Sequence, residues 1–292
     1  MPAIKLYRPE ELSGSEPPPL EQFRHRYLAQ GDSWFSFGQI PPGGSNLLNE
    51  LQFSQRDCAV NCARPGATLN HMVDRLNDRN FSDLLLGRRA RTWDGILFSG
   101  GGNDLIDAAQ VLPTGAGAQP SLRLLLTQSE WTAGLPSPNR YLSDAGWTTL
   151  SDHMRANFER LLAMRDDPAS QSKGCPVFFH TYHFPTPRDA PALAGAFGPW
   201  LYKAVVAYAI PEPDWIALAR LLVERLADLL IAISNEHGAA GNIRIFDTAR
   251  QVNIVPAQLG MTGASGDWAN EIHLTRGGCR KLGGPWGAAI ES

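Results

Sequence analysis

The chain has 292 residues, of which 43% are hydrophobic and 19% are charged, and its formal net charge is -3. This composition is typical of a globular protein, and the length allows one α/β domain with a sizeable core. The charge balance, together with the lack of any Lys- and Arg-rich run interleaved with aromatics, argues against nucleic acid as a partner. No apolar run approaches the roughly 20 residues that a membrane-spanning helix needs, so we expect no transmembrane segment.

The N-terminus and the cysteines indicate the cellular setting. The first thirty residues contain no apolar core of a secretory signal, so we expect a cytoplasmic protein, with a mature secreted form as the alternative. Cys58 and Cys62 lie in a predicted strand, which would separate them by roughly 13 Å, too far for a disulfide or a shared zinc ion. We therefore expect buried free thiols, no bound metal and no cofactor.

Short apolar segments alternate with helical patterns along most of the chain. The apolar segments are rich in aliphatic and aromatic residues and end at Gly, Asp or Pro, which predicts strands at 26–32, 57–63, 94–101, 175–183 and 242–248. Helices are predicted at 67–79, 147–165 and 214–238. Asp214 is the expected N-cap of the last of these, and Gly238 is its expected C-terminal stop.

This alternation predicts a three-layer α/β/α domain with a mainly parallel central sheet of roughly five strands. We expect a single domain over 23–292, preceded by an irregular arm over 1–22. Two segments rich in Pro, Gly and aromatics, 112–146 and 184–213, interrupt the pattern and are predicted to shape the substrate site. Their aromatic residues favour an apolar pocket: Trp131, Tyr141, Trp147, Phe197, Trp200 and Tyr202.

Three polar blocks follow the first three predicted strands, where the ligand sites of parallel sheets gather. Ser33 lies in a Gly-Asp-Ser turn, Gly66 lies in ARPGATL before a predicted helix, and Asn103 follows three consecutive glycines. Phosphate binding is the obvious rival for such glycine-rich turns. The GxGxxG spacing and a following Gly-Lys-Ser/Thr are both missing, which argues against a nucleotide.

A fourth block, GDWANEIHLTRGG, contains His273 near the C-terminus. Asp267, Asn270 and Glu271 lie within six residues of this histidine, so a partner that orients its ring is close at hand. His180 and His183 fall on one predicted strand and should point to opposite faces, which argues against a shared metal ion. His183 is expected to border the substrate pocket.

Together, the four blocks resemble the SGNH hydrolase superfamily (GDSL-type esterases and lipases) from about residue 25 to 285. The four named residues of that family map onto Ser33 in GDSWFS, Gly66 in ARPGATL, Asn103 in GGGND and His273 in NEIH. The resemblance implies a flavodoxin-like fold and hydrolysis of carboxylic esters or thioesters, small or lipid-like, through an acyl-enzyme. Ser33 would be the nucleophile and His273 its general base. The backbone N–H groups of Ser33 and Gly66 and the Asn103 side chain would form the oxyanion hole.

The sequence departs from the family pattern beside the histidine. The family has Asp three residues before it, where this chain has Asn270, and Leu274 follows where the family commonly has Pro. We expect Asp267 to orient His273 if the loop between them curls, with Asn270 as the alternative. Glu271 as the third member, or a dyad without one, is the remaining option.

Two other functions fit the same residues. An acyltransferase would use the same acyl-enzyme and pass the acyl group to an alcohol instead of water. A non-catalytic ligand-binding module on a hydrolase scaffold is favoured only by the substitution at Asn270.

Overall fold

Six parallel strands form the centre of the fold in this computed structural model, which describes residues 2–37 and 45–292. The strands are β1 (Lys5–Tyr7), β2 (Arg26–Gly31), β3 (Cys58–Asn61), β4 (Gly95–Ser99), β5 (Val177–His180) and β6 (Ile243–Phe246). Their order in the sheet is β1-β3-β2-β4-β5-β6. Apart from the edge strand β1, this is the flavodoxin-like order. The predicted fold class and all five predicted strands are confirmed.

The predicted N-terminal arm is only partly irregular, because its residues 5–7 form β1. This strand pairs with β3 in parallel register, with Lys5 opposite Cys58. Three residues ending two positions before Pro9 are too short to show a strand periodicity in the sequence. The prediction of five strands therefore missed an edge strand that depends on its neighbour for hydrogen bonds.

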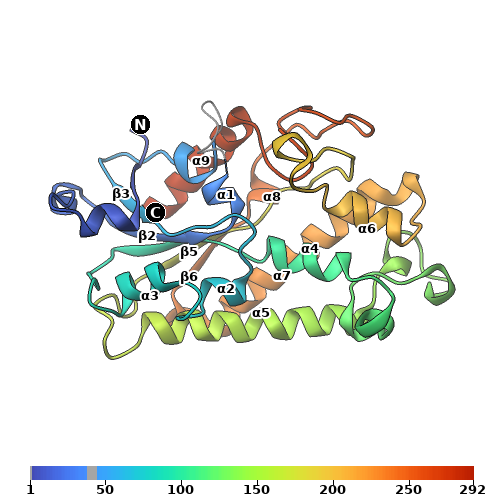
Figure 1. Ribbon diagram of the computed structural model, residues 1–292, viewed down its shortest axis with the longest axis horizontal. Coiled ribbons are helices and arrows are strands. Elements are labelled where there is room, and N and C mark those ends of the chain that lie inside the picture. The colour runs from blue at the N-terminus through green and yellow to red at the C-terminus, as the bar shows by residue number, and fades with distance from the viewer. Residues whose placement is uncertain (1, 38–44) are drawn as a thin grey trace.

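Helices cover both faces of the sheet, with α1 and α9 on one face and α2, α3, α5 and α7 on the other (Figure 1). The helix α4 lies beyond the carboxyl ends of the strands, and α6 packs against it. The helices are α1 (Ser33–Ser36), α2 (Leu69–Met72), α3 (Arg79–Leu85), α4 (Gly102–Gln110), α5 (Asp144–Arg165), α6 (Leu201–Ala207), α7 (Trp215–Gly241), α8 (Thr248–Gln251) and α9 (Arg276–Glu291).

Local capping decides where these helices begin and end. The single helix predicted over 67–79 is wrong, because the Asp78 carboxylate accepts the Phe81 N–H at 3.1 Å and starts α3 as a separate helix. The helix α5 begins at Asp144, three residues earlier than predicted. Asp214 does precede α7, but its carboxylate accepts from the Tyr141 hydroxyl rather than capping the helix. Gly238 interrupts α7 with a φ of 55°.

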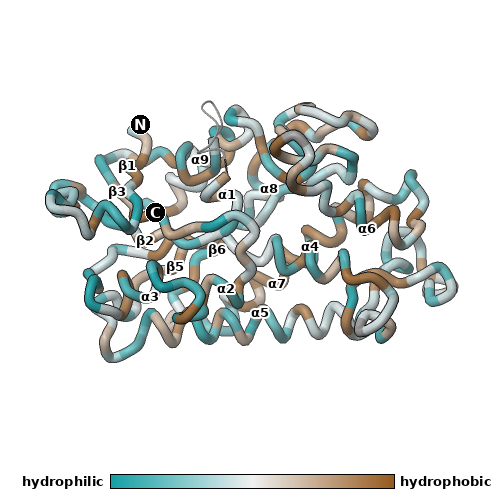
Figure 2. Tube along the Cα trace, in the orientation of Figure 1, coloured by the Kyte–Doolittle hydropathy of each residue, from teal (hydrophilic) through white to brown (hydrophobic). Residues whose placement is uncertain are grey.

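The core lies between the central strands and the helices on each face. Every residue of β4 is buried, as expected of a parallel strand covered on both sides. The ring of Phe179 stacks with those of Phe98 and Phe158, with ring centroids 4.7 Å apart in each pair, and these contacts join the sheet to α5. Hydrophilic residues line the outer edge of α5 (Figure 2). Among the described residues no helix is long and apolar enough to span a membrane.

All four cysteines are free thiols, and Cys58 and Cys62 are buried, which confirms the expectation for that pair. Cys58 is the first residue of the short strand β3, which runs from Cys58 to Asn61, and Cys62 follows directly after it. Burial raises the pKa of the Cys58 thiol to about 12, so it stays protonated at neutral pH.

The helix α9 is packed unusually closely against the backbone at residues 50–52. A Cβ on Gly283 would lie 2.2 Å from the Glu50 carbonyl oxygen, and one on Gly287 would lie 2.1 Å from that of Gln52. Glycine is therefore required wherever α9 crosses this segment. Because α9 begins at Arg276, the contact also fixes the end of the loop that carries His273.

Gly283→Ala should destabilise the fold by about 1–3 kcal/mol, because the new methyl group must displace the Glu50 backbone. The control is Gly277→Ala in the first turn of α9, where the nearest atom to the new Cβ is the Thr275 Oγ1 at 3.7 Å. The control should be neutral or slightly stabilising, since alanine favours a helix over glycine by up to about 1 kcal/mol. Urea unfolding measures both changes. Equal stability of the two variants would contradict the close packing of α9.

Candidate active site

Ser33 is the first residue of α1, directly after the central strand β2. The Asp32 N–H donates to the Ser99 carbonyl at 3.1 Å, and the Asp32 carboxylate accepts the Trp34 N–H at 2.9 Å. These two bonds turn the chain sharply after Gly31 and hold Ser33 at the carboxyl end of the sheet. The Ser33 backbone N–H donates no hydrogen bond to any group within residues 2–37 or 45–292.

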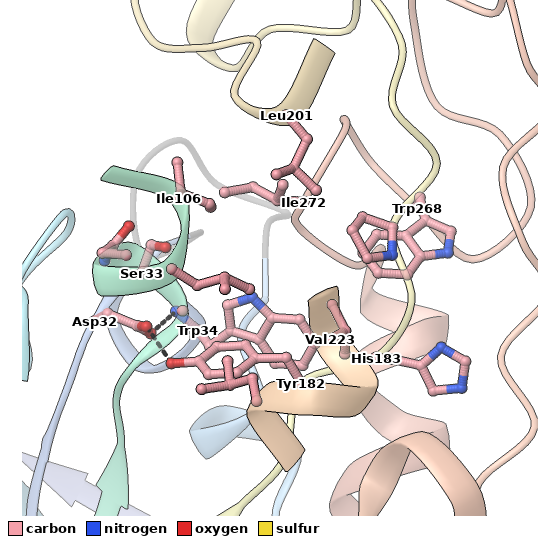
Figure 3. Close-up of a pocket in the computed structure, with 15 residues that line it drawn as sticks. Asp32, Ser33, Trp34, Ile106, Tyr182, His183, Leu201, Val223, Trp268 and Ile272 are labelled. Carbon is pink, nitrogen blue, oxygen red and sulfur yellow. Dashed lines mark hydrogen bonds between the residues drawn. The ribbon is translucent and has the colours of Figure 1, made fainter. Parts of the chain in front are cut away.

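The Asp32 carboxylate is a buried support for this turn. It accepts hydrogen bonds from the Tyr182 hydroxyl at 2.5 Å and from the Trp34 N–H (Figure 3). It also accepts from the Ser99 hydroxyl at 3.2 Å. Burial raises the pKa of Asp32 to about 6, although these hydrogen bonds lower it. The network connects β2, β4 and the segment after β5 directly beneath Ser33.

His273 is held by a local turn around the Asn270 side chain. The Asn270 Oδ1 lies 3.0 Å from the imidazole Nδ1, and it also accepts the backbone N–H groups of Ile272 at 3.1 Å and His273 at 2.9 Å. Because this oxygen can only accept, the tautomer with the proton on Nδ1 is favoured. Nε2 is then the basic nitrogen.

The imidazole is enclosed by aromatic rings. Phe37 stacks on it with ring centroids 4.2 Å apart, and Trp200 meets it edge-on at 5.3 Å. Burial lowers the pKa of His273 to about 3, so the ring is neutral at neutral pH. Its Nε2 is buried and has no hydrogen-bond partner among the residues that the structure describes.

The expected contact between Asp267 and His273 does not form. The Asp267 carboxylate instead accepts from the Lys281 ammonium at 2.6 Å and from the Val255 N–H at 2.6 Å. Asn270, the alternative, takes the position beside the imidazole. The reason is the tight turn over Asn270–His273, which places residues three apart in contact and leaves Asp267 facing α9. Glu271 also points elsewhere, toward the backbone of Trp200 and Tyr202.

Three of the four residues proposed from the sequence line pockets that contain Ser33. Ser33 and His273 line one small pocket, and Ser33 and Asn103 line a larger one beside it. Gly66 lines neither pocket and is exposed, with a φ of 74°. Its loop is nevertheless tied to the site, because the Asn103 Nδ2 donates to the Ala67 carbonyl at 3.0 Å. The Gly66 N–H donates to no group in the described part of the chain.

The larger pocket is mainly apolar and lies between α4, α6, α7 and the His273 loop (Figure 3). Its aliphatic walls are Leu105, Ile106, Leu201, Val223, Leu226 and Ile272. Of the six aromatics predicted to form an apolar pocket, none lines it, and its aromatic residues are Trp34, Tyr182 and Trp268. Trp34 and Tyr182 follow strand ends, a signal that could have identified them. His183 lines the pocket as predicted.

The described residues contain no group of three or more His, Cys, Asp or Glu side chains that could hold a metal ion. Both ring nitrogens of His183 are already used, since Nε2 lies 3.1 Å from the Val252 carbonyl and Nδ1 accepts the Phe184 N–H at 2.9 Å.

Comparison with known proteins gives similarity in structure only. No family model matches the chain, and no curated protein matches it in sequence. An aryl esterase of M. smegmatis is 13% identical with a TM-score of 0.47, covering 91% of this chain and 98% of its own. A carbohydrate acetylesterase from Sinorhizobium meliloti is 12% identical with a TM-score of 0.47, covering 92% and 99%. An extracellular lipase from Streptomyces rimosus is 15% identical with a TM-score of 0.43, covering 90% and 97%. These neighbours are esterases and a lipase.

The buried imidazole predicts how the fold responds to acid. The pKa of His273 is lowered from 6.5 to about 3 in the folded chain. Between these values the unfolded chain binds the extra proton, so the stability that the neutral ring contributes is present above pH 6.5 and is lost as the pH falls toward 3. His273→Gln should reduce the loss of unfolding free energy across this range, by up to about 1.4 kcal/mol per pH unit. Urea unfolding at a series of pH values measures it.

The control is His71→Gln, at a histidine exposed to solvent. This variant should keep the pH dependence of the wild type. An unchanged slope in His273→Gln would show that His273 does not stay neutral in the folded chain.

Proposed function

We propose that the protein is a serine hydrolase that cleaves carboxylic esters or thioesters through an acyl-enzyme on Ser33. The observation that carries the proposal is that Ser33 shares a pocket with a neutral imidazole whose Nε2 has no partner in the described chain. A serine hydroxyl becomes a useful nucleophile only when a base takes its proton. The neutral ring of His273 can accept this proton, and the shared pocket supports its role as the base.

The reaction then follows from the roles of these two side chains. The Ser33 Oγ attacks the substrate carbonyl carbon while its proton passes to the His273 Nε2. The imidazolium gives this proton to the leaving alcohol or thiol as the tetrahedral intermediate collapses, which leaves Ser33 acylated. Water, deprotonated by the same imidazole, releases the acid and restores Ser33. Asn270 keeps the proton of the imidazole on Nδ1 throughout.

Donors for the oxyanion come from three loops. Among the described residues, no group accepts a hydrogen bond from the backbone N–H of Ser33 or Gly66. Asn103 uses one N–H of its amide for the Ala67 carbonyl, and its second N–H is available to the substrate. Each such donor typically contributes about 3 kcal/mol to transition-state stabilisation. Closer approach of the Gly66 loop to the bound carbonyl would complete the set.

The apolar walls of the larger pocket favour substrates whose acyl or alcohol group is a hydrocarbon.

Acyl transfer would differ only in the acceptor, an alcohol in place of water. Product analysis with an added alcohol separates these two outcomes.

Ser33→Ala should lower the hydrolysis of p-nitrophenyl acetate by three orders of magnitude or more, because alanine has no hydroxyl to form the proposed acyl-enzyme. Its control is Ser36→Ala in the same helix, where the lost hydroxyl donates only to the Asp32 carbonyl. The control should keep most of the activity. A fluorophosphonate probe should label wild type and Ser36→Ala but not Ser33→Ala. Wild-type turnover by Ser33→Ala would reject the proposed function.

Asn270→Ala should lower kcat by about 100-fold, since it removes the three hydrogen bonds that hold the His273 turn and tautomer. Asn270→Asp keeps the acceptor geometry and adds a charge beside the imidazolium, so it should restore at least wild-type kcat. Asp267→Asn should change kcat little, because its carboxylate bonds to Lys281 and Val255. A larger loss in Asp267→Asn than in Asn270→Ala would reverse the assignment.

A further inference from the structure

Glu271 has a buried carboxyl group and lies in the sequence between Asn270 and His273, the proposed base that Asn270 orients. It is fully buried, and both its oxygens accept backbone N–H groups of the 184–213 segment. Oε1 accepts the Tyr202 N–H at 2.6 Å, and Oε2 accepts the Trp200 N–H. The Glu271 N–H donates to the Ala190 carbonyl at 3.0 Å. The side chain and the backbone of one residue therefore both hold the His273 loop to this segment.

Arg188 makes the reciprocal contact from the 184–213 segment. Its guanidinium is buried and donates to the Asn270 carbonyl at 2.7 Å, to the Met261 carbonyl at 2.7 Å and to the Gly263 carbonyl. Glu271 and Arg188 are thus both buried ionisable groups, and each bonds mainly to backbone groups of the other segment. Buried charges cost desolvation free energy, and packing apolar residues in their place is often as stable. Stability alone does not account for this pair.

The contacts reach the imidazole through Trp200. Glu271 holds the Trp200 backbone N–H, and the Trp200 ring lies edge-on to the His273 ring at 5.3 Å. The next residues on each side, Leu201 and Ile272, both line the apolar pocket beside Ser33. A shift of the Glu271 carboxylate would therefore move a wall of the imidazole and a wall of the pocket together.

We propose that Glu271 and Arg188 are positioning residues, which use the 184–213 segment to hold the Asn270–His273 turn in its reactive arrangement. This inference rests on the proposed function of His273 as general base. The clamp gives the segment a role in catalysis in addition to any contact with substrate. Burial raises the pKa of Glu271 to about 7, and backbone N–H donors, including those of Trp200 and Tyr202, oppose that rise together with the charge of Arg188.

Glu271→Gln is the central test. The glutamine side chain has one acceptor oxygen, so one of the two backbone N–H groups would face an NH₂ group instead. We expect kcat for p-nitrophenyl acetate to fall between about tenfold and 100-fold, as displacements of about 1 Å at a reacting group can cost this much. KM should change less than twofold, because the acetyl group is too small to depend on the far pocket wall.

Glu130→Gln is the matched control. Glu130 is a partly exposed glutamate that bonds within the other segment, 112–146, where it accepts from the Arg123 guanidinium at 2.5 Å and from the Thr127 N–H at 2.8 Å. It lines neither pocket that contains Ser33. Glu130→Gln should leave kcat within twofold of wild type, and urea unfolding of both variants shows whether their losses of stability are comparable.

A second variant keeps the test decisive if Glu271→Gln does not fold. Trp200→Leu retains the backbone N–H that Glu271 accepts and removes only the ring beside His273. It should lower kcat and slow fluorophosphonate labelling of Ser33 by at least about fivefold, as a smaller effect of the same kind.

The outcomes separate this inference from the proposed function. If Ser33→Ala is inactive while Glu271→Gln and Trp200→Leu keep wild-type kcat, the clamp is rejected and the hydrolase stands. Equal losses of kcat in Glu271→Gln and Glu130→Gln would reject it too, as a general effect of destabilisation. So would a change in KM alone. Activity retained in Ser33→Ala rejects the proposed function itself.

Discussion

The parallel pairing of β2 between β3 and β4 is the constraint on which the candidate site depends. The register places Gly31 opposite Ser99, so β2 and β4 end at one level, and it places Asn61 opposite Ala29, so β3 ends two residues earlier at the same edge of the sheet. The loops that follow must then leave the sheet side by side, and they carry Ser33, Gly66 and Asn103. Buried polar bonds hold this edge: Asp32 accepts from Ser99 and Tyr182, and Asn103 donates to Ala67. Residues far apart in sequence become neighbours because the sheet aligns them.

Burial also determines the protonation states of the ionisable side chains at this edge of the sheet. The pKa of Asp32 is raised to about 6 and that of His273 is lowered to about 3, and in both cases desolvation is the largest cause. The imidazole is neutral at neutral pH, and its Nδ1 contacts the Asn270 amide oxygen, a dipole, whereas no carboxylate of the described residues bonds to the ring. The tetrahedral oxyanion would then be the main negative charge near the imidazolium. In the proposed reaction, the imidazolium and the oxyanion would therefore stabilise each other, and this electrostatic stabilisation would arise only when substrate is bound.

Sequence reasoning predicted those parts of the molecule that depend on local pattern. Five strands were predicted because buried parallel strands are continuous apolar runs, and β1 was missed because three residues give no pattern. Ser33 and Asn103 were proposed from blocks that follow predicted strands, and His273 was proposed from a C-terminal block that contains possible orienting residues. The partner of His273 was assigned first to Asp267, because charge favours it and the turn that brings Asn270 to the ring cannot be read from charge. The pocket aromatics were also misplaced, since lining depends on which helices pack together.

The two Pro- and Gly-rich segments show where such reasoning stops. Both are rich in the same residue types, and both contain an Arg that donates to several backbone carbonyls, Arg123 in 112–146 and Arg188 in 184–213. Arg123 closes its own segment, whereas Arg188 reaches across to the loop that carries His273. The difference arises because 184–213 leaves the carboxyl end of β5 and passes the C-terminal loop, while 112–146 follows α4 and packs against the start of α5. Topology thus determines which of the two chemically similar segments contacts the loop that carries His273. The lengths and compositions of the segments do not predict this difference.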